Sequence, residues 1–143
     1  MDKTTLVKEQ IDGGARLVRR LREGGVEVNG ALWARTGSDS KDYLYLITPE
    51  VENRDTNAAY GRVGDALKSL IDDNIPWEEQ IYPFAVKLIP PSHRLARGVL
   101  DHFARIPDAH PTWHHDTTLG SAYIENAYIY PATLFAPLPA AAS

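Results

Sequence analysis

The stretch from Ala31 to Pro49 constrains the fold more than any other part of this sequence. It holds two short runs rich in apolar residues, separated by the polar segment 37–42 (GSDSKD). This layout predicts a β-hairpin with a long, open turn. Side chains alternate between the faces of a strand, so one face is expected to be aliphatic: Leu32, Ala34, Leu44 and Leu46. The opposite face is then largely aromatic: Trp33, Arg35, Tyr43, Tyr45 and Ile47.

A second hairpin with the same asymmetry is predicted over residues 119–130. If Glu125 and Asn126 form its turn, Asn126 suits the positive φ that a two-residue turn requires. One face of this hairpin is then aliphatic, and the other carries the tyrosines. Together the two hairpins are expected to place six aromatic side chains on one outer sheet face: Trp33, Tyr43, Tyr45, Tyr123, Tyr128 and Tyr130.

Three explanations of this aromatic face stay open. Tyrosine and tryptophan favour strands intrinsically, so the face can simply be exposed. Monomers rarely leave large apolar patches uncovered and homodimers are the commonest oligomers, so a second copy can cover it. Aromatic sheet faces also bind small ligands, peptides or nucleic-acid bases.

The remaining elements are predicted from apolar periodicity and from helix-terminating residues. A first helix is expected from Thr4 or Thr5 to Glu23, followed by Gly24 and Gly25. Further helices are expected over 56–73, capped by Asp55, and up to residue 105, capped by Ser92, with a strand over 84–89 between them. Residues 106–118 are expected to form a loop.

Two glycines, Gly13 and Gly14, interrupt the first predicted helix. Each costs a helix about 1 kcal/mol relative to alanine. Close approach of a neighbouring backbone is therefore expected to compensate.

This order of elements predicts an α+β domain. We expect a mainly antiparallel sheet of about five strands, with about three helices packed on one face. The strand between two helices also allows a parallel neighbour in a mixed sheet. The domain is expected to span residues 1–131, and 132–143 to form an irregular tail rich in proline and alanine, in which Leu134 and Phe135 can pack.

Composition narrows the class of protein. The 143 residues are 43% hydrophobic and include no cysteine, so disulfides and thiolate chemistry are excluded. The sequence shows neither the layout of a signal peptide nor an apolar run long enough to span a membrane. A cytoplasmic protein without a cofactor is expected. The net charge of −4 makes nucleic acid an unlikely partner.

Two clusters offer alternative functions. The segment HPTWHHD contains the densest set of potential metal ligands: His110, His114, His115 and Asp116. These residues would serve a small metal-dependent hydrolase or nuclease, although a polar surface loop explains them too. The first helix carries Arg16, Arg19, Arg20 and Arg22, which would suit a nucleic-acid binder but also fit a solvated helix face.

The whole layout resembles a group of small, uncharacterised bacterial proteins. The resemblance spans about residues 5–131 and is carried by Ala31-Leu32-Trp33, Ile47-Thr48-Pro49, Lys87-Leu88-Ile89 and a closing Ile-Glu-x-Ala-Tyr-Ile-Tyr-Pro segment, here Ile124 to Pro131. In that pattern glycine is expected where this sequence has Asn126. The resemblance implies no catalytic residues.

We therefore expect a non-enzymatic interaction or accessory domain that forms a homodimer through the aromatic sheet face. A different protein is the alternative partner for the same face. The metal-dependent hydrolase and the nucleic-acid binder are the alternatives.

Overall fold

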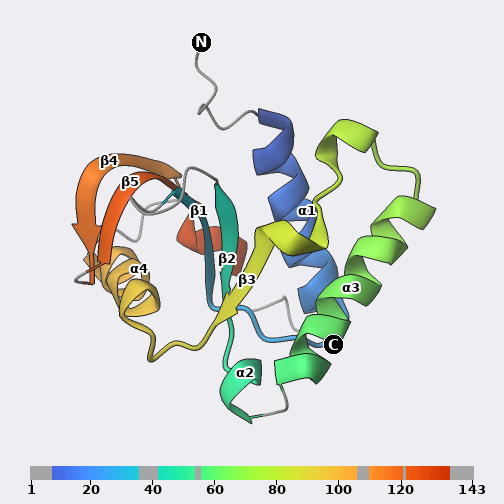
Figure 1. The fold of residues 1–143 in the computed structure, drawn as a ribbon, viewed down its shortest axis with the longest axis horizontal. Helices are drawn as coiled ribbons and strands as arrows, with labels where there is room; N and C mark the ends of the chain where they lie inside the picture. The colour runs from blue at the N-terminus through green and yellow to red at the C-terminus, as the bar shows by residue number, and fades with distance from the viewer. Residues whose placement is uncertain (1–7, 36–41, 54–55, 106–109, 121, 136–143) are drawn as a thin grey trace.

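The computed structural model describes residues 8–35, 42–53, 56–105, 110–120 and 122–135. They form an α+β fold built on one five-stranded sheet (Figure 1). The strands are β1 (Gly30–Arg35), β2 (Tyr43–Ile47), β3 (Val86–Ile89), β4 (Thr112–Leu119) and β5 (Ala122–Ile129). The α-helices are α1 (Lys8–Glu23), α2 (Glu50–Asn53), α3 (Thr56–Asp72) and α4 (Arg94–Arg105). Three 3-10 helices complete the fold: η1 (Trp77–Glu79), η2 (Pro83–Ala85) and η3 (Ala132–Phe135).

The strands run in the order β3-β2-β1-β5-β4. Only β3, which follows the long helix α3, lies parallel to its neighbour β2, and the other pairs are antiparallel. The predicted fold class is therefore confirmed, including the parallel neighbour that the helix-flanked strand allowed.

The three main helices cover both faces of the sheet instead of the single face that was predicted. Helices α1 and α3 lie on one side, and α4 lies on the other (Figure 1). Each side has its own apolar cluster. One contains Leu17, Leu67 and Leu44, and the other contains Leu95 and Ile129. The central strand β1 is thus buried on both faces, and each of its residues is buried.

The predicted faces of the first hairpin are wrong by one residue of register. Trp33 pairs with Leu44, and Leu32 pairs with Tyr45. Because directly paired residues share a face, Trp33 lies with the leucines of β2 on the α1 side. Leu32 lies with Tyr45 on the α4 side. The loop length sets this register, and residues 36–41 of the loop lie outside the described residues.

The second hairpin also differs from its prediction. Glu125 and Asn126 lie within β5 rather than in a turn, and the turn follows β4 at Gly120, whose φ is 55°. Residues 112–118, predicted as loop, form most of β4. Pairing of the two strands is interrupted at Asp116, which has a φ of 46°. Both strands are strongly curved (Figure 1).

Helix ends follow their sequence signals closely. Helix α1 ends at Glu23, with Gly25 at a φ of 91°, and α3 ends at Asp72, before Asn74 at a φ of 61°. The start of α4 differs from the prediction, because His93 and not Ser92 caps it: its Nδ1 accepts a hydrogen bond from the Leu95 amide. The predicted starts at Thr4, Thr5 and Asp55 lie outside the described residues.

The chain after β5 is more ordered than the predicted irregular tail. Residues 132–135 form η3, and both Leu134 and Phe135 pack against the α1-side cluster, as expected for these two side chains. Phe135 also stacks on Phe103 of α4 at a centroid distance of 5.9 Å. The rest of the tail, 136–143, lies outside the described residues.

Candidate functional site

The six aromatic residues expected on one face are divided between the two sides of the sheet. Trp33, Tyr128 and Tyr130 lie on the α1 side and are buried within the chain. Tyr45 lies on the α4 side, where Tyr43 receives the Lys87 ammonium 4.2 Å from its ring centroid. Tyr123 is exposed on β5. The predicted aromatic surface therefore does not exist as one continuous face.

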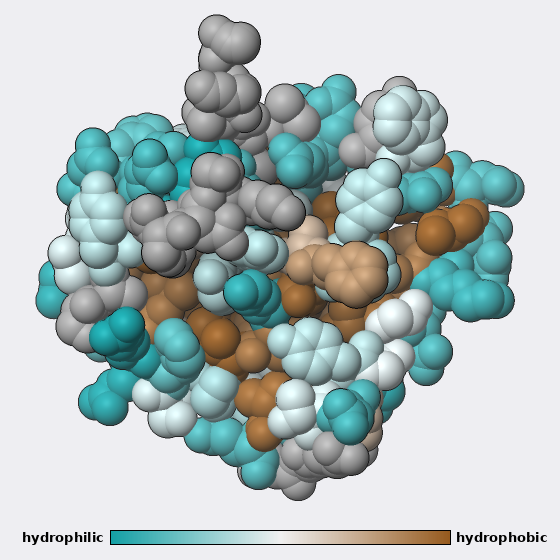
Figure 2. Space-filling view, in the orientation of Figure 1, coloured by the Kyte–Doolittle hydropathy of each residue, from teal (hydrophilic) through white to brown (hydrophobic). Residues whose placement is uncertain are grey.

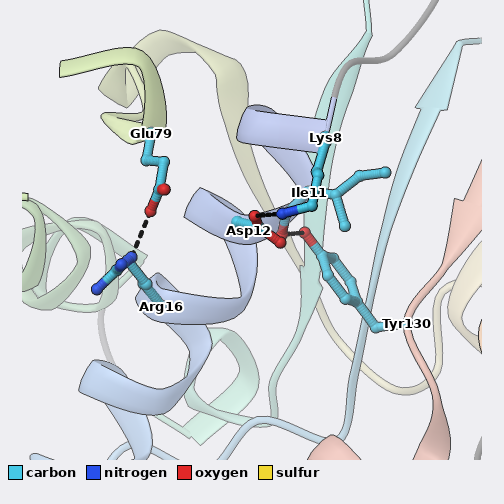
Figure 3. A network of polar contacts seen from close by, with 6 residues as sticks. All are labelled: Lys8, Ile11, Asp12, Arg16, Glu79 and Tyr130. Atoms are coloured by element: carbon cyan, nitrogen blue, oxygen red, sulfur yellow. Dashed lines mark hydrogen bonds and ion pairs between the residues drawn. The ribbon is translucent and has the colours of Figure 1, made fainter. Parts of the chain in front are cut away.

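Helix α1 covers the buried part of that set. Trp33 Nε1 donates a hydrogen bond of 3.0 Å to the Tyr130 hydroxyl, which itself donates one of 2.6 Å to the Ile11 carbonyl (Figure 3). The Tyr130 oxygen lies so close to Gly14 that a Cβ there would overlap it. Burial raises the pKa of the Tyr130 hydroxyl well above its ordinary value. This contact is why the helix carries a glycine at position 14.

The second helical glycine places a different segment. Gly13 lies directly against the backbone carbonyl of Glu79 in η1, which leaves no room for a Cβ. The prediction that a neighbouring backbone compensates for the glycines is confirmed here. The Glu79 carboxylate also pairs with Arg16, one turn further along α1 (Figure 3). The segment that leads from α3 to β3 is therefore held firmly against α1.

A groove lies beside this docked segment. It has a volume of about 370 Å³. Its walls come from α1, β1, the end of α3 and the segment before β3: Gln10, Trp33, Ile71, Trp77, Gln80, Ile81, Tyr82, Pro83 and Ala85. The groove thus combines two indole rings and one phenol ring with two side-chain amides.

Large aromatic side chains project from the same segment into solvent. Trp77 is 75% exposed, Tyr82 77% and Phe84 91%. Ile71, at the end of α3, is half exposed beside them. Apolar side chains gather over the middle of the face that Figure 2 presents, on the side of β2 and β3. We call these four side chains and the adjoining groove the 77–84 surface.

Prolines explain why these rings point outward. Pro76 precedes η1, and Pro83 is the first residue of η2. A proline fixes φ near the value that the first turn of a helix needs, and it cannot donate a strand hydrogen bond. The segment therefore folds into two short 3-10 turns and not into an extension of β3, and its rings do not alternate between sheet faces.

The potential metal ligands of β4 are not brought together. His114 lies against His102 of α4, and Oγ1 of Thr112, in β4 itself, lies 3.1 Å from the His114 Nε2. His115 bonds Asn126 on the neighbouring strand, and Asp116 accepts a hydrogen bond of 2.7 Å from Tyr123. Across the described part of the chain, no group of three or more histidine, cysteine or acidic side chains is arranged to hold a metal. His110 is exposed before the strand begins.

The arginines of α1 are largely engaged inside the molecule. Arg16 pairs with Glu79, and Arg20 bonds Ser69 and Asp73 of the α3 region, the Asp73 contact at 2.5 Å. Arg22 donates to the Leu134 carbonyl at 2.6 Å. Arg19 is exposed. Three of the four residues considered for nucleic-acid binding therefore brace α1 against its neighbours.

Comparison of the chain with protein-family models, with curated proteins and with solved structures finds no match. The resemblance to small bacterial proteins thus stays a prediction. Within the described residues, none of the helices has the length and apolar character needed to cross a membrane.

Sequence reasoning overlooked the 77–84 surface. Residues 76–83 show neither helical nor strand periodicity and were assigned to no element. Phe84 was predicted to begin the strand over 84–89, but it lies in η2, and β3 begins at Val86. The usable signal was the combination of three aromatic residues with two prolines in one short segment. A segment of this kind lacks the alternation that would bury one side of it, so its rings were the ones to expect in solvent.

Proposed function

We propose that this protein is a non-enzymatic interaction domain that self-associates through the 77–84 surface. The observation that carries the proposal is the exposure of Trp77, Tyr82 and Phe84 beside an aromatic groove. The proposed dimer contact therefore differs from the predicted one. The predicted sheet face is not available, because Trp33, Tyr128 and Tyr130 are buried within the chain.

The exposed area supports a protein partner. A fully buried aromatic side chain removes roughly 150–250 Å² from solvent, so three rings exposed by three quarters or more offer roughly 350–600 Å². This matches the largest patch that a typical monomer exposes, which is often functional. It is also about half of the ~800 Å² that each partner contributes to a standard interface.

Shape favours a second copy as that partner. In a twofold dimer the same patch serves both subunits, so it must be complementary to itself. The 77–84 surface carries a projecting ring, Phe84, which does not line the groove, and next to it a groove walled by Trp77 and Tyr82. We place Phe84 of each copy in the groove of the other.

Charge does not oppose this arrangement. Three acidic side chains near the surface that the structure describes have cation partners within the chain: Asp72 with Lys68, Asp73 with Arg20, and Glu79 with Arg16. Two copies therefore meet with these acids already paired. A desolvated aromatic contact ringed by polar residues is the usual composition of an interface centre.

Sedimentation velocity over a concentration series tests the proposal. The unmodified protein is expected to show a reversible monomer–dimer equilibrium. Phe84→Ser removes the projecting ring, and its dimer is expected to be at least about tenfold weaker, because central aromatic residues carry most of an interface's energy. Phe84 is almost fully exposed, so the variant is expected to fold normally, which far-ultraviolet circular dichroism checks.

Tyr123→Ser is the matched control. Tyr123 is also an exposed aromatic residue, but it lies on β5, away from the 77–84 surface in Figure 1. Its removal is expected to leave the dimer unchanged. A protein that stays monomeric at the highest attainable concentration contradicts the proposal, and so does equal weakening by the two substitutions.

A further inference from the structure

Two histidines from different elements meet at one hydroxyl group. His102, in the last turn of α4, and His114, in β4, each place Nε2 3.1 Å from Thr112 Oγ1. Their ring centroids are 5.3 Å apart, and the rings are nearly perpendicular. All three side chains are partly buried. Sequence patterns do not reveal this pair, because its members belong to two different elements, α4 and β4.

The shared hydroxyl can hydrogen-bond both rings in several protonation states, so the cost of protonating both rings is electrostatic. A threonine hydroxyl has one proton to donate and two lone pairs, so it can donate to one imidazole and accept from the other. This chain of two hydrogen bonds tolerates one protonated ring. When both rings are protonated, two cations lie about 5 Å apart in a partly desolvated site, which is unfavourable.

The surroundings offer little to compensate a second charge. Burial is the main cause that lowers the pKa of His114, and the positive charges of His102 and His115 lower it further. From β4 itself, His115 bonds Asn126 and Asp116 bonds Tyr123. From α4, Asp101 and Arg105 are exposed, as is Glu125 of β5. His114 is therefore a ring that resists protonation.

We propose that the His102–His114 pair makes the docking of α4 onto β4 sensitive to acid. Protonation of both rings drives the end of α4 away from the strand. The proposal concerns the face opposite the 77–84 surface side of the sheet and does not depend on self-association.

The other contacts of α4 determine which part of the helix is expected to open first. Leu95, Ala96 and Val99 bury α4 against the sheet, and Gly98 lies tightly against the backbone of Gly120 in the β4–β5 turn. These contacts involve no titratable group, so the earlier turns of α4 stay docked longer than its last turn. Acid is therefore expected to open α4 from its C-terminal end first.

Hydrogen exchange at a series of pH values tests this directly, after correction for the intrinsic pH dependence of exchange. Between about pH 7.5 and about pH 5, where unperturbed histidine titrates, the opening constant of the last turns of α4 is expected to rise about tenfold, as a displacement of one pKa unit gives. His114→Gln keeps a polar group near Thr112 but cannot be protonated. In this variant the rise is expected to fall below about threefold.

Controls keep the test decisive. His115→Gln removes the adjacent, exposed histidine on the other side of β4 and is expected to retain the acid-induced rise. If His114→Gln does not fold, His102→Gln replaces it, and the ring-proton NMR titration of His114 in the unmodified protein gives a second measurement. That titration is expected below pH 6.5, the ordinary histidine value. Unchanged protection of α4 across the pH range overturns the proposal, as does an equal rise in the His114 and His115 variants.

Discussion

Gly13 of α1 and the backbone carbonyl of Glu79 lie in direct contact, with no space between them for a Cβ atom. Through this contact the helix and the segment that carries the 77–84 surface position each other. The Glu79 backbone contacts Gly13, and the Glu79 side chain pairs with Arg16. Helix α1 and η1 are therefore expected to move together.

Gly13→Ala is therefore expected to destabilise the fold. The new methyl group meets backbone and not the end of a flexible side chain, and overpacking of this kind costs about 1–3 kcal/mol. Urea unfolding followed by tryptophan fluorescence measures the loss. Because η1 must shift, we also expect weaker self-association of the variant at a concentration where it is folded. A stability equal to that of the unmodified protein would show that η1 is not held in this way.

Gly61→Ala and Gly64→Ala are expected to have the opposite effect. Both glycines lie on the exposed side of α3, and a Cβ at either position would meet nothing within 4 Å. Alanine favours the interior of a helix by up to about 1 kcal/mol over glycine. Each substitution is expected to raise the free energy of unfolding by about 0.5–1 kcal/mol in the same urea experiment. Together with Gly13→Ala, these variants separate helix propensity from steric contact.

Tyr130→Phe is expected to cost about 1–3 kcal/mol, because the Trp33 indole loses its acceptor and the Ile11 carbonyl loses a donor in a buried site. Tyr82→Phe removes an exposed hydroxyl instead and is expected to change stability by less than about 0.5 kcal/mol. Equal effects of the two substitutions in thermal or urea unfolding would mean that the buried hydroxyl contributes nothing.

The buried Tyr130 hydroxyl is also expected to make the free energy of unfolding depend on pH in the alkaline range. Burial raises the pKa of Tyr130 far above its ordinary value of 10.0, so the folded protein keeps this proton when the unfolded chain has lost it. The resulting stability is complete below pH 10 and is lost as the pH rises above it. Stability curves at several pH values above 10 measure this loss, which Tyr130→Phe is expected to reduce.

Arg35 and Asp42 form an ion pair of 2.9 Å whose side chains are largely buried. Asp42→Leu leaves the buried guanidinium without its charge partner, which typically costs about 3–5 kcal/mol. The double variant Arg35→Met with Asp42→Leu removes both charges and is expected to be clearly more stable than the single one. A double-mutant cycle measured by urea unfolding checks this order, and a double variant less stable than Asp42→Leu would reverse it.

The sequence predicts the boundaries of elements better than their mutual placement. Apolar periodicity and the glycines after Glu23 locate α1 and α3, because these signals act within one or two turns of a helix. The register of β1 on β2 is not a local property. It depends on a loop, and a shift of one residue moved Trp33 from the expected surface into the core.

Strand β4 was missed for a related reason. Its sequence after Trp113, HHDTT, is polar on both sides, since it is an edge strand whose outer face meets solvent. Asn126, in turn, has the residue type of a tight turn but lies in β5, because Gly120 makes the turn instead. Of the candidate site, the sequence indicates that Trp77, Tyr82 and Phe84 are exposed, but their placement on one surface follows only from the two 3-10 turns.

The outer edge of β3 limits how copies of this domain can add to one another. The Leu88 amide donates a hydrogen bond of 3.0 Å to the Tyr60 hydroxyl, and the Val86 amide donates to the Pro83 carbonyl. A strand from another chain would have to break both bonds before it could extend the sheet on this side. Growth into a ribbon by backbone pairing is therefore disfavoured at this edge, which leaves contacts between side chains as the means of assembly there.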